Sequence, residues 1–237
     1  MKKLSVFLFL FSFFYTKGQS SDSANTKHSE ASDSAANFYF ANQRETLAIH
    51  NGRIFYGYPG MVNHAFYPEA GWQNGSLLYD GIWYHGISFM YDIYKDELVI
   101  LHPNNTPVRL FSDRVQEFYF QGQNFVRLSQ DKDYIIKSGF YQRLTEGNAT
   151  IFARRYKEMQ ENIVELAIER IFVGFNEYYV LKDGNYHAIV RKKSLLNLLK
   201  DKRQEIVQHL SQKKLRYKDD VEKSIVQIVE FYNQSYK

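Results

Sequence analysis

From Phe38 to about Val190 the chain repeats one pattern, in which short runs of alternating apolar and polar residues are broken by dipeptides that favour turns. Alternation with a period of two is typical of a β-strand that buries one face. Asn51-Gly52 and Asp80-Gly81 each separate two such runs, and both suit a type I′ hairpin turn, whose two central residues need positive φ. The spacing predicts a meander of about eight to ten antiparallel strands, as a curved sheet or half-barrel. Later turns are indicated at Lys95-Asp96, Asn104-Asn105, Gly122-Gln123, Glu146-Gly147-Asn148 and Asp183-Gly184-Asn185.

One strand, residues 82–93, can be assigned by face. The odd-numbered residues from Trp83 to Ile93 are mostly large and apolar, so we expect them to face a core. Glycines crowd this region, including Gly86, and indicate bends or bulges. Residues 59–75 form the longest irregular segment, and long ordered loops often carry function.

After Arg191 the pattern becomes helical. Residues 193–200 suit one helix, and Asp201 is expected to cap a second. Asp219 with Glu222 resembles a capping box for a third helix. The apolar stripe of that third helix should pack on the sheet; its members are Val221, Ile225, Ile228, Val229 and Tyr232. The fold class expected is therefore α+β, with a β-rich body at 38–190 and a packed helical segment at 191–237. Residues 156–172 fit either period, and we favour a strand.

The first 18 residues have the layout of a cleavable signal peptide. Lys2 and Lys3 give a basic start, and residues 4–15 are apolar apart from two serines. This run is shorter than the roughly 20 apolar residues that a membrane-spanning helix needs. The alternative, a buried N-terminal helix, fits poorly with the Ser-rich segment that follows. We expect cleavage between Gly18 and Gln19, and no other segment could span a bilayer.

Residues 19–37 contain no apolar side chain larger than alanine, so we expect a disordered spacer. Removal of the leader leaves 27 basic and 26 acidic side chains, a net charge of +1. The charge is uneven, because residues 182–237 hold 13 Lys or Arg against 7 Asp or Glu. Two readings stay open for this excess: solvated helical faces, or docking onto an anionic partner. Nucleic acid is a poor candidate for an exported chain.

The chain has no cysteine, which excludes disulfides, thiolate metal sites and a cysteine nucleophile. A lipid-modified N-terminal cysteine is excluded as well. The product is therefore expected in the periplasm or outside the cell, and not as a lipoprotein.

A resemblance is carried by residues 177–233, EYYVLKDGNYHAIVRKKSLLNLLKDKRQEIVQHLSQKKLRYKDDVEKSIVQIVEFYN, and by GFYQRLTEGNATIFARRYKE upstream. This half of the chain resembles uncharacterised secreted proteins common in Bacteroidota, in which an aromatic-Lys-Asp-Gly hairpin precedes Lys-rich helices. The resemblance covers roughly residues 135–235. It implies secretion but brings no known activity or catalytic residue.

The histidines and carboxylates are the residues that could form a catalytic or metal site. His50, His64, His85 and His102 lie 14, 21 and 17 positions apart and show no metal-binding motif, so neither a metal nor a cofactor is expected. His64 lies in the long loop, and Asp80 or Glu69 could pair with it as in a hydrolase. Asp80 is also explained by its turn.

Aromatic residues are in excess, at 34 of the 219 residues after the leader. They suit sugar stacking and protein interfaces, although a β-rich core also absorbs many. Tyr67 and Trp72, in the long loop, are the candidates for ligand or partner contact.

The sequence favours an exported, non-enzymatic binding or interaction module of the cell envelope. Its partner would be an envelope protein, a glycan or an apolar ligand. Two alternatives stay open: a periplasmic carrier of an acyl chain, and a hydrolase that uses His64 with a nearby carboxylate. An apolar concavity would favour the carrier, and a His64–carboxylate hydrogen bond the hydrolase.

Overall fold

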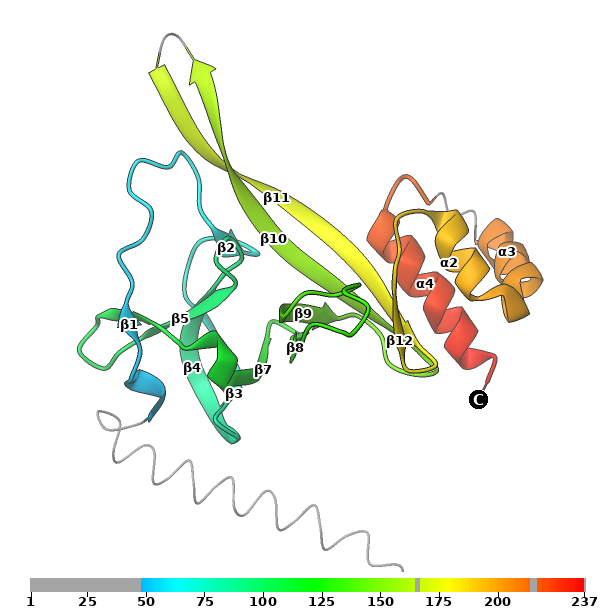
Figure 1. Ribbon diagram of the computed structural model, residues 1–237, viewed down its shortest axis with the longest axis horizontal. Helices are drawn as coiled ribbons and strands as arrows, with labels where there is room; N and C mark the ends of the chain where they lie inside the picture. Colours follow the sequence, from blue (N-terminus) through cyan, green and yellow to red (C-terminus); the bar gives the residue numbers. More distant parts are fainter. Residues whose placement is uncertain (1–47, 165–166, 214–216, 237) are drawn as a thin grey trace, which may run out of the picture.

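The computed structural model describes residues 48–164, 167–213 and 217–236 (Figure 1). The leader expected at 1–18 and the spacer expected at 19–37 lie outside these ranges. The described chain is an α+β protein, as predicted, in which helices follow one antiparallel sheet. The sheet is open and uncurled, and does not form the expected curved sheet or half-barrel. None of the described helices combines the length and apolar character needed to span a bilayer.

The sheet has twelve strands, and most neighbours in space are neighbours in sequence. Their order is β1-β6-β5-β4-β3-β7-β8-β9-β10-β11-β12, with β2 paired to β4. The strands are β1 (Arg53–Ile54), β2 (Phe66–Tyr67), β3 (Gln73–Tyr79), β4 (Ile82–Asp92), β5 (Glu97–Leu101), β6 (Pro107–Arg109), β7 (Val115–Phe120), β8 (Gln123–Leu128), β9 (Gly139–Arg143), β10 (Ala149–Val164), β11 (Ala167–Lys182) and β12 (Asn185–Ala188). The helices are α2 (Lys192–Leu198), α3 (Arg203–Gln212) and α4 (Val221–Gln234), with 3₁₀ turns η2 (Ala48–His50), η3 (Ser112–Arg114) and η4 (Lys200–Lys202).

The two hairpin turns predicted most strongly have different outcomes. Asp80 and Gly81 have φ of 51° and 77° and join β3 to β4, which confirms the hairpin. Asn51-Gly52 does not form one, because it follows η2 and leads into β1, whose partner is β6. Gly52 is needed there for a close approach, since a Cβ would lie 2.2 Å from the carbonyl oxygen of Arg109.

A bulge at Gly86 changes which side of β4 is buried. Pairing with β3 shifts between Gly75 and Ser76, so that Gly86, with φ of 66°, is the extra residue. From Ile87 onward the odd residues face the core, as expected. Before the bulge the assignment was wrong, because Tyr84 is buried whereas Trp83 and His85 are not.

An aromatic core fills the sheet from β3 to β9. Tyr91, Phe118, Phe125 and Phe140 are each 1% exposed or less, and the rings of Phe118 and Phe125 stack with centroids 4.9 Å apart. This cluster accounts for much of the aromatic excess, as the core reading of the sequence expected.

The helices pack on the base of β10 and β11, where they form a second core (Figure 1). In α4, Ile225, Ile228, Val229 and Tyr232 are at most 2% exposed, so this helix is docked as predicted. Val221, at the first position of the helix, was also expected in the buried stripe but is 39% exposed. Its cap is Asp220, not Asp219, and the Asp220 carboxylate accepts a hydrogen bond from the backbone of Lys223.

The second predicted cap is also wrong. α3 begins after Lys202, and Asp201 instead accepts hydrogen bonds from the hydroxyls of Tyr232 and Tyr236. Asp201 therefore ties the end of α4 to η4 rather than starting a helix.

Strands β10 and β11 are paired over sixteen positions and form a long two-stranded arm (Figure 1). They contain the described part of residues 156–172, which are therefore strand. The pairing of β10 with β9 ends at Ala153, so that the rest of the arm leaves the sheet.

Candidate functional site

The predicted hydrolase residues do not come together in hydrogen bonds. His64 Nδ1 accepts a hydrogen bond from the backbone of Phe66 at 3.2 Å and lies 3.5 Å from the Lys157 ammonium. Burial lowers the pKa of His64, and the charge of Lys157 lowers it further. Asp80 forms an ion pair with Arg114 at the β3–β4 turn. Glu69 is exposed, and within the described residues no carboxylate is hydrogen-bonded to His64.

His64 instead borders an aromatic hollow of about 390 Å³ beside the long loop. Phe55, Tyr58 and Phe66 line it, and Tyr58 donates a hydrogen bond to the buried carboxylate of Asp92. Burial raises the pKa of Asp92 above its usual range, and the Tyr58 hydrogen bond partly offsets this effect. No three metal-ligating side chains gather anywhere in the described ranges.

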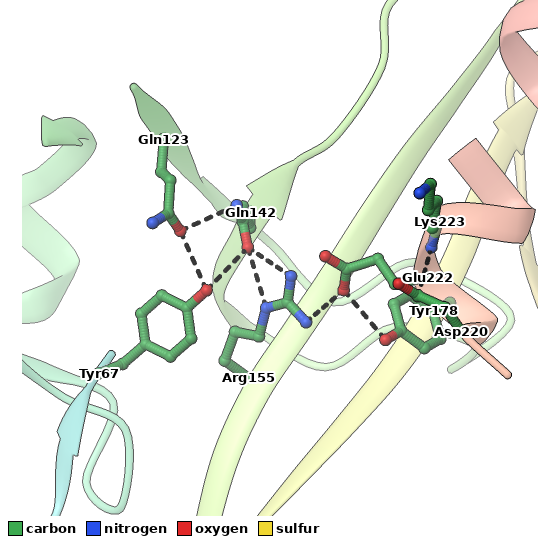
Figure 2. Close-up of polar contacts among 8 residues, drawn as sticks. All are labelled: Tyr67, Gln123, Gln142, Arg155, Tyr178, Asp220, Glu222 and Lys223. Carbon is green, nitrogen blue, oxygen red and sulfur yellow. Dashed lines mark hydrogen bonds and ion pairs between the residues drawn. The ribbon is translucent and has the colours of Figure 1, made fainter. Parts of the chain in front are cut away.

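The two predicted contact residues lie in different surroundings. Trp72 is 39% exposed, as a contact residue would be. Tyr67 is half-buried, and its hydroxyl donates to Gln123 at 3.0 Å and to Gln142 at 3.5 Å (Figure 2). Tyr67 is thus part of a polar network at the root of the arm.

Arg155 is the centre of this network (Figure 2). Its side chain is 5% exposed and donates from Nε and Nη2 to the Gln142 side-chain oxygen at 2.9 and 2.6 Å. On its other side, Arg155 Nη1 lies 2.5 Å from a Glu222 oxygen, which also accepts from the Tyr178 hydroxyl at 3.0 Å. The network therefore joins the long loop, β9, both arm strands and α4.

The electrostatics of the network follow from burial and pairing. Burial by itself lowers the pKa of Arg155, but the hydrogen bond to Glu222 and nearby negative groups raise it above its ordinary value. Burial, together with the charge of Glu222, raises the pKa of Tyr178 to about 12. Arg155 is therefore a fixed positive charge, and Tyr178 a neutral donor, at any physiological pH.

A polar groove of about 370 Å³ lies where β10 parts from the rest of the sheet. One wall is the β4–β5 turn with Tyr94, Lys95 and Asp96, and Lys137 comes from the segment before β9. The other wall is the arm. The arm residues that line the groove are Arg154, Arg155, Tyr156, Lys157 and Glu158 of β10 and Glu177 of β11.

Four of the groove's five cations have no carboxylate partner in the described part of the chain. Lys95, Lys137, Arg154 and Lys157 form no ion pair within the ranges that the structure describes. Lys157 donates to the backbone oxygens of His64 and Phe66 at 2.7 and 3.1 Å, and burial lowers its pKa. Lys95 and Arg154 lie over the rings of Tyr94 and Tyr156, at 4.4 and 5.6 Å from the centroids.

Two of the groove's carboxylates are instead hydrogen-bonded to neutral donors. Asp96 accepts from the Tyr91 hydroxyl at 2.6 Å and from the backbone of Phe140 at 3.0 Å, and burial raises its pKa. Glu177 accepts from the hydroxyls of Tyr156 and Tyr179, at 3.3 and 2.8 Å. Because these acids are satisfied by hydroxyl and amide groups, they leave Lys95, Lys137 and Arg154 available to a ligand, while Lys157 is held by the two backbone oxygens.

The sequence did carry one signal for this site. Ile151, Ala153 and Arg155 share one face of β10, which is apolar from Ala149 to Ala153, and a charged side chain that continues a buried apolar face needs a partner. The partner, Glu222, lies on a helix that no strand pattern could have connected to it.

The fold and this site define an α+β protein with an open antiparallel sheet, a projecting arm and a cationic groove at the root of the arm. The chain matches no protein-family model, no curated protein and no solved structure.

Proposed function

We propose that this chain is an exported, non-enzymatic binding module of the cell envelope, and that its groove holds an anionic ligand. The observation that carries the proposal is that four cations of one groove have no carboxylate partner among the residues that the structure describes. Such groups form their strongest hydrogen bonds with carboxylate, sulfate or phosphate oxygens. The signal-peptide pattern and the resemblance to secreted proteins support the export part of the proposal.

The lining favours an acidic saccharide as the anion. Lys95 and Arg154 lie over the rings of Tyr94 and Tyr156, so a sugar would meet the ring edges and polar tips beside these cations rather than a free ring face. The volume of about 370 Å³ lies at the small end of the range for ligand pockets. An acyl chain would bury the four cations without replacing their water, which disfavours the carrier alternative at this groove.

The test is a binding titration with polysaccharides of different charge. Isothermal titration of the mature chain with polygalacturonate should show binding, and neutral dextran should show none. Arg154→Gln with Lys137→Gln should weaken binding by about tenfold or more, because two charge-assisted contacts are lost.

The basic excess at the C-terminal end supplies a matched control. Lys213→Gln with Lys218→Gln removes the same charge from exposed positions outside the groove. Binding that falls equally in both double variants, or only in the second, would show that the polyanion is held elsewhere. Absence of binding to the acidic polymer would contradict the proposal directly.

Export is tested separately by mass spectrometry of the protein recovered from an exporting host. We expect an N-terminus within about two residues of Gln19. Asp at positions 9 and 10, in place of Phe9 and Leu10, should retain the chain in the cytoplasm because charges disrupt the apolar core of the leader. An exported chain that keeps Met1 would contradict this part.

A further inference from the structure

The far end of the arm exposes apolar side chains that no part of the described chain covers. We call the described residues 158–164 and 167–170 the arm tip. Met159, Ile163 and Ile168 are 46%, 81% and 64% exposed. Ile163 and Ile168 are cross-strand partners, and Met159 is four residues before Ile163, so all three lie on one face. Val62, 64% exposed, adjoins them because its backbone donates to the Arg170 carbonyl.

The arm tip is also acidic. Glu158, Glu161 and Glu169 are exposed, and Arg170 is the one basic side chain among its described residues. Arg170 is already paired with Glu161 at 2.9 Å. Glu161, paired with Arg170, lies on the same face as Met159 and Ile163, whereas Glu158 and Glu169 lie on the opposite face and form no ion pair within the described chain. A tip that is net negative and apolar on one face is complementary to an exposed surface that carries basic groups.

Such a surface exists at the opposite end of the same molecule. Residues 191–203 contain six Lys or Arg and a single acidic residue, Asp201. The Asp201 carboxylate accepts hydrogen bonds from two tyrosine hydroxyls. Lys202 is paired with Glu205, and the other five cations of this segment form no ion pair within the described chain. We call these five the basic ridge: Arg191, Lys192, Lys193, Lys200 and Arg203. Val190, next to the ridge, is 78% exposed and supplies an apolar contact.

We propose that the arm tip of one copy docks on the basic ridge of a second copy. The base of the arm packs against the helices while the tip projects away from them, so the tip cannot reach the ridge of its own molecule (Figure 1). Both halves of the complementary pair are present on this one chain, which is why we assign the partner as a second copy. The contact joins two different surfaces, so it produces head-to-tail chains or a closed ring rather than a two-fold dimer.

Sedimentation velocity of the mature chain tests this proposal. The weight-average sedimentation coefficient should rise with concentration in low salt. It should return to the monomer value in 1 M salt, where the Debye length is about 3 Å. A chain that stays monomeric at every concentration in low salt would overturn the proposal.

Charge reversal provides the sharper test. Tip reversal (Glu161→Lys with Glu169→Lys) and ridge reversal (Lys193→Glu with Lys200→Glu) should each weaken self-association by at least about tenfold. Mixing the two variants should restore association, because each reversed surface then meets its complement. Association that survives both reversals, or a mixture that stays monomeric, would overturn the assignment. Lys132→Glu, exposed and outside both surfaces, is the control and should change nothing.

Discussion

Replacement of Arg155 by methionine tests whether the polar network holds the two ends of the molecule together. Loss of one partner of a buried ion pair costs about 3–5 kcal/mol. The Glu222 side chain is 33% exposed, so water can partly solvate it after the change, and we expect about 3 kcal/mol. Glu222→Gln leaves Arg155 buried but keeps an acceptor, and should cost about 2 kcal/mol. The double variant should cost about 1–2 kcal/mol less than the sum, since both changes remove the same contact.

Urea unfolding, followed by two signals, measures these costs. The chain has two tryptophans, Trp72 and Trp83, which lie in or beside β3 and β4, whereas far-UV circular dichroism also reports the helices. In the wild type the two transitions should coincide. In Arg155→Met the helical signal should be lost at lower urea, because α4 loses its tie to β9 and the long loop. Additive costs within about 0.5 kcal/mol, with coincident transitions in every variant, would refute the coupling.

Three further predictions concern single positions. Ile225→Ala should cost about 2–5 kcal/mol in denaturant melts because the side chain is fully buried, while exposed Lys223→Ala should stay within about 0.5; equal small shifts would show that α4 is undocked. Gly147→Ala should cost about 2 kcal/mol or more, because φ is +140° and a Cβ would lie 2.7 Å from the Asn233 side chain; a negligible shift would contradict that contact. The NMR titration midpoint of His64 should lie below its ordinary pKa of 6.5, and a midpoint above 6.5 would contradict the prediction. Because the unfolded state then binds a proton more readily than the folded state, the contribution of His64 to stability is full above pH 6.5 and falls as the pH drops toward the folded pKa.

The strand pattern and the turn at Asp80-Gly81 could be read from the sequence because both are local properties. A period of two and a pair of residues that tolerate positive φ each depend on a few neighbouring positions. The face assignment failed at Gly86, since one inserted residue reverses the alternation and a single glycine does not say whether it bends or bulges a strand. Asn51-Gly52 failed for a related reason, because glycine was needed for a close approach to β6 rather than for a turn.

The groove was missed because it is assembled from distant segments. Lys95, Lys137 and Arg154 belong to separate turns and strands, and their meeting depends on where β10 parts from β9. In the long loop, Tyr67 joins the network and His64 adjoins Lys157. The expected pairing of His64 with Asp80 could not be judged without knowing that Arg114 already holds Asp80.

The nearest-neighbour order of the strands has a consequence for how the chain acquires this structure as it is synthesised. Most hairpins can close as soon as their second strand emerges, because short loops cost little entropy to close. β3 must wait for β7, however, and β1 for β6. The root of the arm waits longest, because Arg155 has no carboxylate until α4 arrives at the end of the chain. The last helix is therefore expected to decide when folding is complete, and a chain truncated before Glu222 should remain a partly folded intermediate with its arm unsecured.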